Sequence, residues 1–215
     1  MTDRIIVLVD GSIYSRSVCE HAAWVASRTG AAITLLHVLG RHEAPEGTDL
    51  SGSLALGVRT ALLKELSELD EKRAKLARQR GRAILDDAKA VVQAAGVEDV
   101  TTLLRHGDVV ETVKELEGEA ALLAVGKRGE AADFAKLHLG SNLERIARSV
   151  HRPLLVAARA FKPIESVLIA YDGGTSAMKA VNHVARNPLF QGSRSSPSGR
   201  NRRKHARSST TLRPF

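Results

Sequence analysis

Five apolar runs, each bounded by turn residues, recur along the first 158 residues of the chain. They cover residues 4–9 (RIIVLV), 32–39 (AITLLHVL), 100–105 (VTTLLR), 121–125 (ALLAV) and 154–158 (LLVAA). Runs that stay apolar without alternation are typical of strands covered on both faces. The segments between them have helical spacing, so strands and helices are expected to alternate. This pattern predicts an open, doubly wound α/β fold with a five-stranded parallel sheet.

The helical segments have recognisable ends. Gly30 follows the helix expected at residues 14–29 and is suited to the position after a helix C-terminus. Asp108 is followed three residues later by Glu111, which is the spacing of a capping box and predicts a helix start. Ser141 and Glu144 have the same spacing and predict another helix, which ends near residue 150.

One expected helix is unusually long. Residues 54–95 keep helical periodicity, and one apolar stripe is interrupted by two arginines. The stripe consists of Leu62, Leu66, Leu69, Leu76, Ala83 and Ile84, with Arg73 and Arg80 between them. The arginines indicate that the middle of this helix projects into water. An extended arm with a partner surface and an insertion that is merely solvated are both consistent with the pattern.

The opening pattern of the chain occurs a second time. Residues 5–12 read IIVLVDGS and residues 167–174 read VLIAYDGG, and a helical segment follows each of them. An internal repeat is the best interpretation, with a second copy that stops after one strand and one helix. The expected organisation is a domain at residues 1–160, the start of a second copy at 161–190, and a tail at 191–215.

The net charge of +8 is concentrated in that tail. Residues 191–215 carry seven Lys or Arg residues and no acid, whereas residues 1–190 are nearly neutral at +1. This Ser- and Arg-rich segment has too little apolar surface to offset the entropy cost of ordering, so it is predicted to be disordered. A solvated tail without a dedicated partner is favoured over nonspecific contact with nucleic acid.

The most informative loop follows the fourth apolar run. In an open parallel sheet, ligands bind beyond the carboxyl ends of the strands. There this chain places glycines, two bases and the start of a helix, which together are suited to a phosphate group. These residues are Gly126, Lys127, Arg128, Gly129, Gly140 and Ser141. A tight loop that needs glycines only for its turns is the equally weighted alternative. Asp10, after the first run, is placed to hold a ribose hydroxyl or a magnesium ion, or to act as a simple helix-end charge.

Several other classes of chemistry are disfavoured. The chain lacks both G-x-x-x-x-G-K-[ST] and a G-x-G-x-x-G after its first apolar run. Its histidines lack metal-ligand spacing, and the single Cys19 excludes an internal disulfide. Ser12 and Ser141 lie outside a nucleophile elbow, so no enzymatic activity is expected. No apolar run is long enough for a membrane span and no secretory signal is recognised, so a cytoplasmic location is expected.

The chain resembles the universal stress protein family. The resemblance lies in IIVLVDGS at the start, LLHV in the second run, and AVGKRG followed by LGS, a helix and HRPLLVA. It covers about residues 3–158, and residues 165–187 resemble the start of a second copy. The family's nucleotide loop usually has nine residues between its second and third glycines, whereas ten separate Gly129 from Gly140 here.

The resemblance implies a binding site for ATP or a related adenine nucleotide, with magnesium as a possible companion. Asp10, with Gly11 and Ser12 beside it, would lie near the ribose or the metal, and the Val38 backbone would meet adenine. The residues around the ribose and phosphates would be Gly126, Lys127, Arg128, Gly129, Gly140, Ser141 and Asn142. The family also pairs domains through the last strand, which here is residues 154–158, from Leu154 to Ala158. A homodimer through that edge strand is therefore expected.

Three functional hypotheses follow. The first is a stress-response regulatory protein that binds an adenine nucleotide without fast turnover. The second is a dimeric interaction module of the same fold that binds no nucleotide, which the ten-residue spacing and the long helix favour. The third, a slow ATPase, depends only on Asp10 as a metal ligand.

Overall fold

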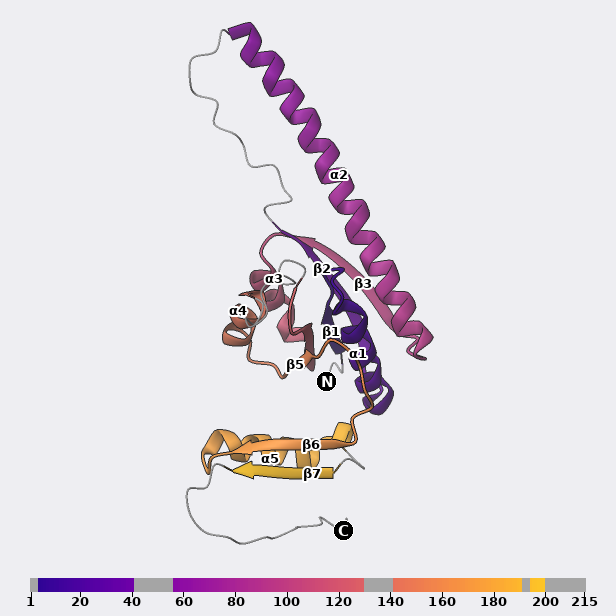
Figure 1. Cartoon of the computed structure of the whole chain (residues 1–215), viewed down its shortest axis with the longest axis vertical. Helices are drawn as coiled ribbons and strands as arrows, with labels where there is room; N and C mark the ends of the chain where they lie inside the picture. The colour runs from indigo at the N-terminus through magenta and orange to yellow at the C-terminus, as the bar shows by residue number, and fades with distance from the viewer. Residues whose placement is uncertain (1–3, 41–55, 130–140, 191–193, 200–215) are drawn as a thin grey trace. The chain divides into compact units, whose positions relative to one another are not determined.

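The computed structural model describes residues 4–40, 56–129, 141–190 and 194–199. The chain divides into two compact units, Met1–Lys162 and Pro163–Phe215, which are considered one at a time. Figure 1 labels their helices and strands.

The first unit contains a five-stranded parallel sheet, as the sequence predicted. Its strands are β1 (Arg4–Leu8), β2 (Ala32–Leu39), β3 (Val100–His106), β4 (Leu122–Gly126) and β5 (Leu154–Ala157). Their order across the sheet is β3-β2-β1-β4-β5, and every neighbouring pair is parallel. The central strand β1 has three buried residues in a row, which explains its run of unbroken apolar sequence.

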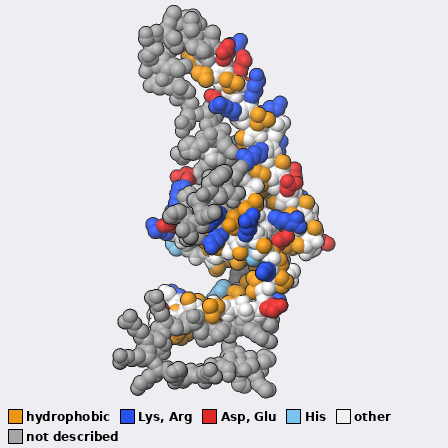
Figure 2. Space-filling view, viewed as in Figure 1, with side chains coloured by type: hydrophobic (Ala, Val, Ile, Leu, Met, Phe, Trp, Pro, Cys, Tyr) orange, Lys and Arg blue, Asp and Glu red, His pale blue; other side chains and the backbone are white. Residues whose placement is uncertain are grey.

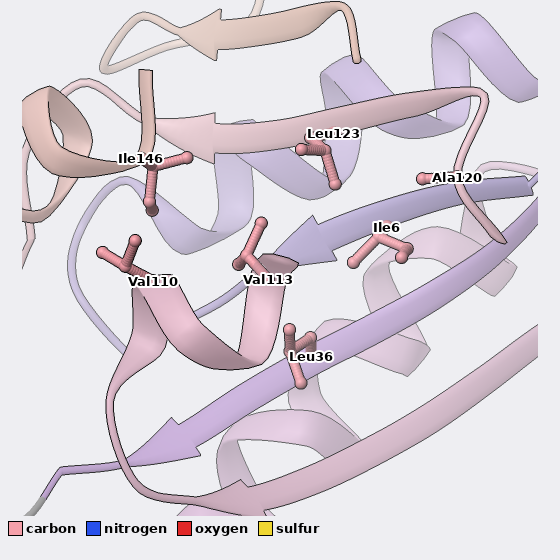
Figure 3. Packing of buried hydrophobic residues seen from close by; sticks show 7 residues of the cluster. All are labelled: Ile6, Leu36, Val110, Val113, Ala120, Leu123 and Ile146. Carbon is pink, nitrogen blue, oxygen red and sulfur yellow. The ribbon is translucent and has the colours of Figure 1, made fainter. Parts of the chain in front are cut away.

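Helices cover both faces of this sheet. Helices α1 (Ser15–Thr29) and α2 (Leu56–Ala94) pack against each other on one face, and α3 (Val109–Leu116) and α4 (Ser141–Ser149) pack together on the other. Figure 3 shows the core beneath α3 and α4, where Val110, Val113 and Ile146 from the helices meet Ile6, Leu36 and Leu123 from the strands. The short 3-10 helix Glu117–Glu119 leads from α3 toward β4.

The predicted helix ends have clear structural causes. Gly30 has φ 70°, and its N–H donates to the carbonyl of Ala26, so it closes the C-terminus of α1. The Asp108 carboxylate accepts hydrogen bonds from the N–H groups of Val110 and Glu111, which caps α3. Helix α2 ends within one residue of the predicted limit and begins two residues after it.

The second unit is small. It contains β6 (Ser166–Tyr171), α5 (Thr175–Arg186), the 3-10 helix Pro188–Phe190 and β7 (Arg194–Gly199), with β6 and β7 paired in parallel. Residues 191–215 were predicted to be disordered, and this prediction is wrong for β7, because pairing with β6 makes Arg194–Gly199 part of a sheet despite their polar composition. The rest of that predicted tail lies outside the described residues. In this unit the described strands make a two-stranded sheet, so a second copy of the five-stranded domain is not shown.

Candidate functional site

The strand order reverses its direction of winding between β1 and β4. From β1 the chain continues to β2 and β3 on one side, and β4 and β5 are then added on the other side. The direction of winding therefore reverses between β1 and β4, which is where open α/β sheets bind ligands. The register pairs Val7 with Ala124, so the loops that follow β1 and β4 leave the sheet at the same edge.

The loop after β1 is organised around Asp10. One oxygen of its carboxylate, Oδ1, accepts hydrogen bonds from the Ser12 N–H at 2.9 Å and the Ser15 hydroxyl at 3.1 Å. The Ser15 hydroxyl oxygen in turn accepts from the N–H groups of Asp10 and Gly11, at 3.2 and 3.0 Å. Gly11 has φ 79°, a backbone conformation that favours glycine. Asp10 is therefore held in place by its own loop and by the first residue of α1.

Gly129 lies against the Asp10 carboxylate. A Cβ atom at position 129 would lie 3.0 Å from the other carboxylate oxygen, Asp10 Oδ2, which is closer than ordinary contact distance. Gly129 does not have a positive φ, so the close approach to Asp10, and not a left-handed turn, accounts for this glycine. Two candidate residues that are far apart in the sequence are thus brought together beyond the carboxyl ends of β1 and β4, a place called the β1–β4 edge below.

Gly126 has a different neighbour. A Cβ atom at position 126 would lie 2.8 Å from the Cβ of Tyr14 and 3.2 Å from the Arg128 carbonyl oxygen. Tyr14 is buried just before α1 begins, so Gly126 lets the end of β4 pack against the start of that helix. Contact with Tyr14, and not a left-handed turn, therefore accounts for this glycine.

The two basic residues of the loop differ in exposure. The Lys127 side chain is exposed, whereas Arg128 is half-buried. The Lys127 N–H donates to the carbonyl of Ala157 at 3.0 Å, so this amide is engaged by β5. Any interaction of Lys127 with an anion would therefore use its ammonium group.

The remaining candidates are placed less completely. Val38 is half-buried near the end of β2 and packs against the core cluster under α3 and α4. Ser141 begins α4, as predicted, and the Asn142 side chain is exposed. Gly140 lies outside the described residues, so the helix mouth that was expected to bind phosphate is described only from residue 141 onward.

Sequence reasoning missed two contributors to the β1 loop. Ser15 organises the Asp10 carboxylate, and the repeated serine three residues after Ser12 was the available signal. Ile84 of α2 approaches the same loop, since a Cβ atom at Gly11 would lie 2.8 Å from its Cδ1. No local signal could identify Ile84, because the long helix meets the loop only through tertiary packing.

An ion pair and a His–Glu hydrogen bond lie on the α3–α4 side of the sheet. Arg145 Nη2 donates to Asp108 Oδ2 at 2.8 Å, and this hydrogen bond is the main reason that the pKa of Asp108 is lowered. Partial burial raises the pKa of Glu117, but hydrogen bonds from the His151 N–H and ring outweigh it and lower the pKa overall. Both contacts fasten α3 and the segment after it to the region around α4 and β5.

Cys19 is fully buried in α1, and burial raises the pKa of its thiol to about 12. Such a thiol is a packing residue and not a nucleophile. Within the described ranges, no group of three or more His, Cys, Asp or Glu side chains is arranged to hold a metal ion. The helices among these residues also include none that is long and apolar enough to cross a membrane.

Comparisons with known proteins agree with this architecture. The model of the universal stress protein family matches residues 1–158. Universal stress protein Slr1230 of Synechocystis is 39% identical over 188 residues, which are 86% of this chain and 66% of that protein, so the chain spans slightly less than two thirds of this relative.

A solved structure with a TM-score above 0.5 has the same fold. The structure of the hypothetical protein MJ0577 is 21% identical, has a TM-score of 0.52, and is matched over 75% of this chain and 99% of that one. A universal stress protein solved in complex with cAMP is 20% identical, with a TM-score of 0.47 and coverage of 73% of this chain and 97% of that chain.

Proposed function

Because this chain belongs to the universal stress protein family, we propose that it binds an adenine nucleotide, ATP in the first instance, at the β1–β4 edge. The observation that carries the proposal is the contact between Asp10 and Gly129. These residues follow adjacent parallel strands at the point where the winding reverses, and a Cβ atom at position 129 would force the Asp10 carboxylate to shift by a few tenths of an ångström. The site combines that carboxylate with two bases and the start of a helix.

Each part of the site suits a different part of the nucleotide. The Asp10 carboxylate has the chemistry to accept a hydrogen bond from a ribose hydroxyl or to ligate a magnesium ion. Lys127 and Arg128 carry positive charge at the edge where the phosphates would lie, and α4 begins at Ser141 with backbone N–H groups that suit an anion. The Val38 backbone near the end of β2 remains the proposed contact for adenine.

The proposed role is regulatory and not catalytic. Asp10 Oδ1 already accepts two hydrogen bonds, one from Ser12 of its own loop and one from Ser15 of α1, which suits a positioning carboxylate more than a base that must exchange protons. The family's name links its members to stress responses, and we propose that the nucleotide acts in such a response as a bound ligand whose occupancy changes the surface offered to partners. The cytoplasmic location expected from the sequence stays a prediction.

Calorimetric titration of the full chain with ATP, with and without magnesium, tests the proposal. Gly129→Val should weaken binding by at least about tenfold, or about 1.4 kcal/mol, because its side chain would displace Asp10. Gly118→Val is the matched control, since a Cβ atom there meets nothing within 4 Å. Absence of binding to the wild-type chain, or equal binding by the wild type and Gly129→Val, would refute a nucleotide at this edge.

Turnover is tested separately. Phosphate release from bound ATP should be negligible, and Asp10→Ala should leave the background rate unchanged while weakening binding. Release that depends on Asp10 would instead support the slow ATPase.

A second candidate function is a dimeric interaction module. Among the described strands, β5 pairs only with β4, so it forms an edge of the sheet, and Val156 on it is 42% exposed. An exposed apolar edge strand invites pairing with another chain. If the chain dimerises and binds no nucleotide, and Val156→Lys abolishes the dimer, this second function would replace the first.

A further inference from the structure

Helix α2 carries an apolar stripe that its own sheet does not cover. Leu69 and Leu76 are 51% and 63% exposed, and Leu66 lies on the same face at the spacing of a heptad. The sheet-facing residues of α2 are Gly81, Leu85, Ala88 and Val92, which are all buried. At 100° per residue, the leucine stripe is turned roughly a third of a turn around the helix from that face. These leucines therefore lie on a different face of α2 from the residues that pack on the sheet, and Ile84, farther along the same stripe, approaches the loop after β1 instead.

The C-terminal part of α2, from Gly81 onward, packs on the sheet, and the leucines lie in the part of the helix before it. Gly81 is packed so closely on β2 and β3 that a Cβ atom would lie 2.8 Å from Leu104 Cδ1 and 3.0 Å from His37 Cδ2. Before Gly81, no residue from Leu63 to Arg80 is buried, and this half of the helix extends away from the strands in Figure 1. Eighteen residues of exposed helix measure about 27 Å. In Figure 2, hydrophobic and charged side chains both occur along this arm.

The charges on the arm are separated along its length. Residues 64–71 carry four acids and one base, whereas residues 72–82 carry six bases and no acid. The acids are Glu65, Glu68, Asp70 and Glu71, and the bases after them are Lys72, Arg73, Lys75, Arg78, Arg80 and Arg82. A surface with one acidic half and one basic half is complementary to itself when it is turned end for end.

We propose that the arm, residues 63–80 of α2, pairs antiparallel with the same arm of a second copy of this chain. With Leu66 opposite Leu76 of the second copy, the acidic half of each arm lies against the basic half of the other. Parallel pairing would instead place Arg73 opposite Arg73 and bring Glu65 near Asp70, which are like-charge contacts. The two arginines within the stripe limit the affinity, and we expect a dissociation constant on the order of 10 µM.

This pairing is independent of the proposed nucleotide site and of the β5 edge, because it uses neither set of residues. Sedimentation velocity of the full chain from about 1 to about 100 µM should show concentration-dependent association. Leu76→Lys should weaken it at least about tenfold, whereas Leu168→Lys is the matched control, because Leu168 is also exposed, at 71%, but lies in β6. Val156→Lys should leave the arm pairing intact.

A second variant tests whether any loss of association in Leu76→Lys comes only from a local change at position 76. Glu65→Lys combined with Glu68→Lys keeps all the leucines but leaves only Asp70 and Glu71 as acids in residues 64–71, so it reduces the charge complementarity and should also weaken association. Circular dichroism should show unchanged helix content in both variants, since the altered side chains are exposed.

Disulfide trapping tests the orientation. A mixture of Leu66→Cys and Leu76→Cys chains should form mixed cross-links, whereas parallel pairing would cross-link Leu76→Cys with itself. Cys19 is buried and does not compete. The proposal is overturned if the chain stays monomeric across the concentration range, if association is lost with Val156→Lys but not with Leu76→Lys, or if self-cross-links of Leu76→Cys predominate.

Discussion

The loops that follow β1 and β6 have the same local structure but different surroundings. Asp10 accepts a hydrogen bond from the N–H two residues later at 2.9 Å, and Asp172 does the same at 2.8 Å. The glycine after each aspartate has a positive φ, 79° at Gly11 and 86° at Gly173. The repeated Asp-Gly sequence therefore produces the same local turn twice.

The surroundings of the two turns are not alike. Strand β1 is buried between two helical layers, whereas β6 alternates between exposed and half-buried residues. Asp10 also meets Ser15 and Gly129, and Gly11 is approached by Ile84. A Cβ atom at Gly173 would meet nothing within 4 Å. The Asp-Gly turn is therefore a local structure. It becomes part of a candidate site only where residues of a second helix and of the loop after a second strand contact it.

The largest expected difference between the two regions is the loss of stability when an apolar strand residue is replaced by alanine. Ile6→Ala in β1 removes a side chain that is 2% exposed and should lower the free energy of unfolding by about 2–5 kcal/mol. Leu168→Ala in β6 should change stability by less than about 0.5 kcal/mol, because its side chain is mostly in water already. Urea denaturation followed by circular dichroism compares them. Equal losses would contradict the different burial of the two strands.

The matched glycines provide a sharper comparison. Gly173→Ala should cost about 1 kcal/mol from the positive φ alone. Gly11→Ala should cost about 1 kcal/mol more, because its new methyl group would also displace Ile84. Thermal denaturation of the two variants measures the difference. The double variant Gly11→Ala with Ile84→Ala should recover the additional loss relative to Ile84→Ala alone, and a failure to recover it would locate the strain elsewhere.

A third aspartate, Asp108, caps a helix instead of forming an Asp-Gly turn. Asp108→Ala removes the cap of α3 and should cost about 1 kcal/mol at pH 7. Asp108→Asn keeps an acceptor for the cap but loses the ion pair with Arg145, so it should cost only a few tenths of a kcal/mol.

The effect of Asp108 should depend on pH with a defined sign. Its pKa is lowered in the folded chain, so the ionised carboxylate stabilises the fold above its ordinary pKa, and this stabilisation is lost as the pH falls through the folded-state value. The stability difference between wild type and Asp108→Asn should therefore disappear in acid. Denaturation curves from pH 7 down to about pH 3 measure it, and a difference that grew in acid would contradict the assignment.

The sequence placed Gly126 and Gly129 together after the fourth apolar run, but it could not predict the reason for each glycine. The structure makes Gly126 the last residue of β4 and leaves Gly129 in the loop that follows. Only the tertiary structure distinguishes Gly126, which accommodates Tyr14, from Gly129, which accommodates the Asp10 carboxylate. Both environments depend on contacts with the segment that leaves β1, and the spacing of glycines within one loop carries no information about a distant segment.

The sequence by itself determined the alternation of strands and helices, the caps at Gly30 and Asp108, and the two Asp-Gly turns. Each of these depends on backbone preferences and hydrogen bonds within a few residues. The tertiary structure alone decided that the loops after β1 and β4 meet, that Ile84 of α2 reaches Gly11, and that Arg194–Gly199 pair with β6. These outcomes depend on strand order and packing between residues far apart in the chain, which local patterns do not encode.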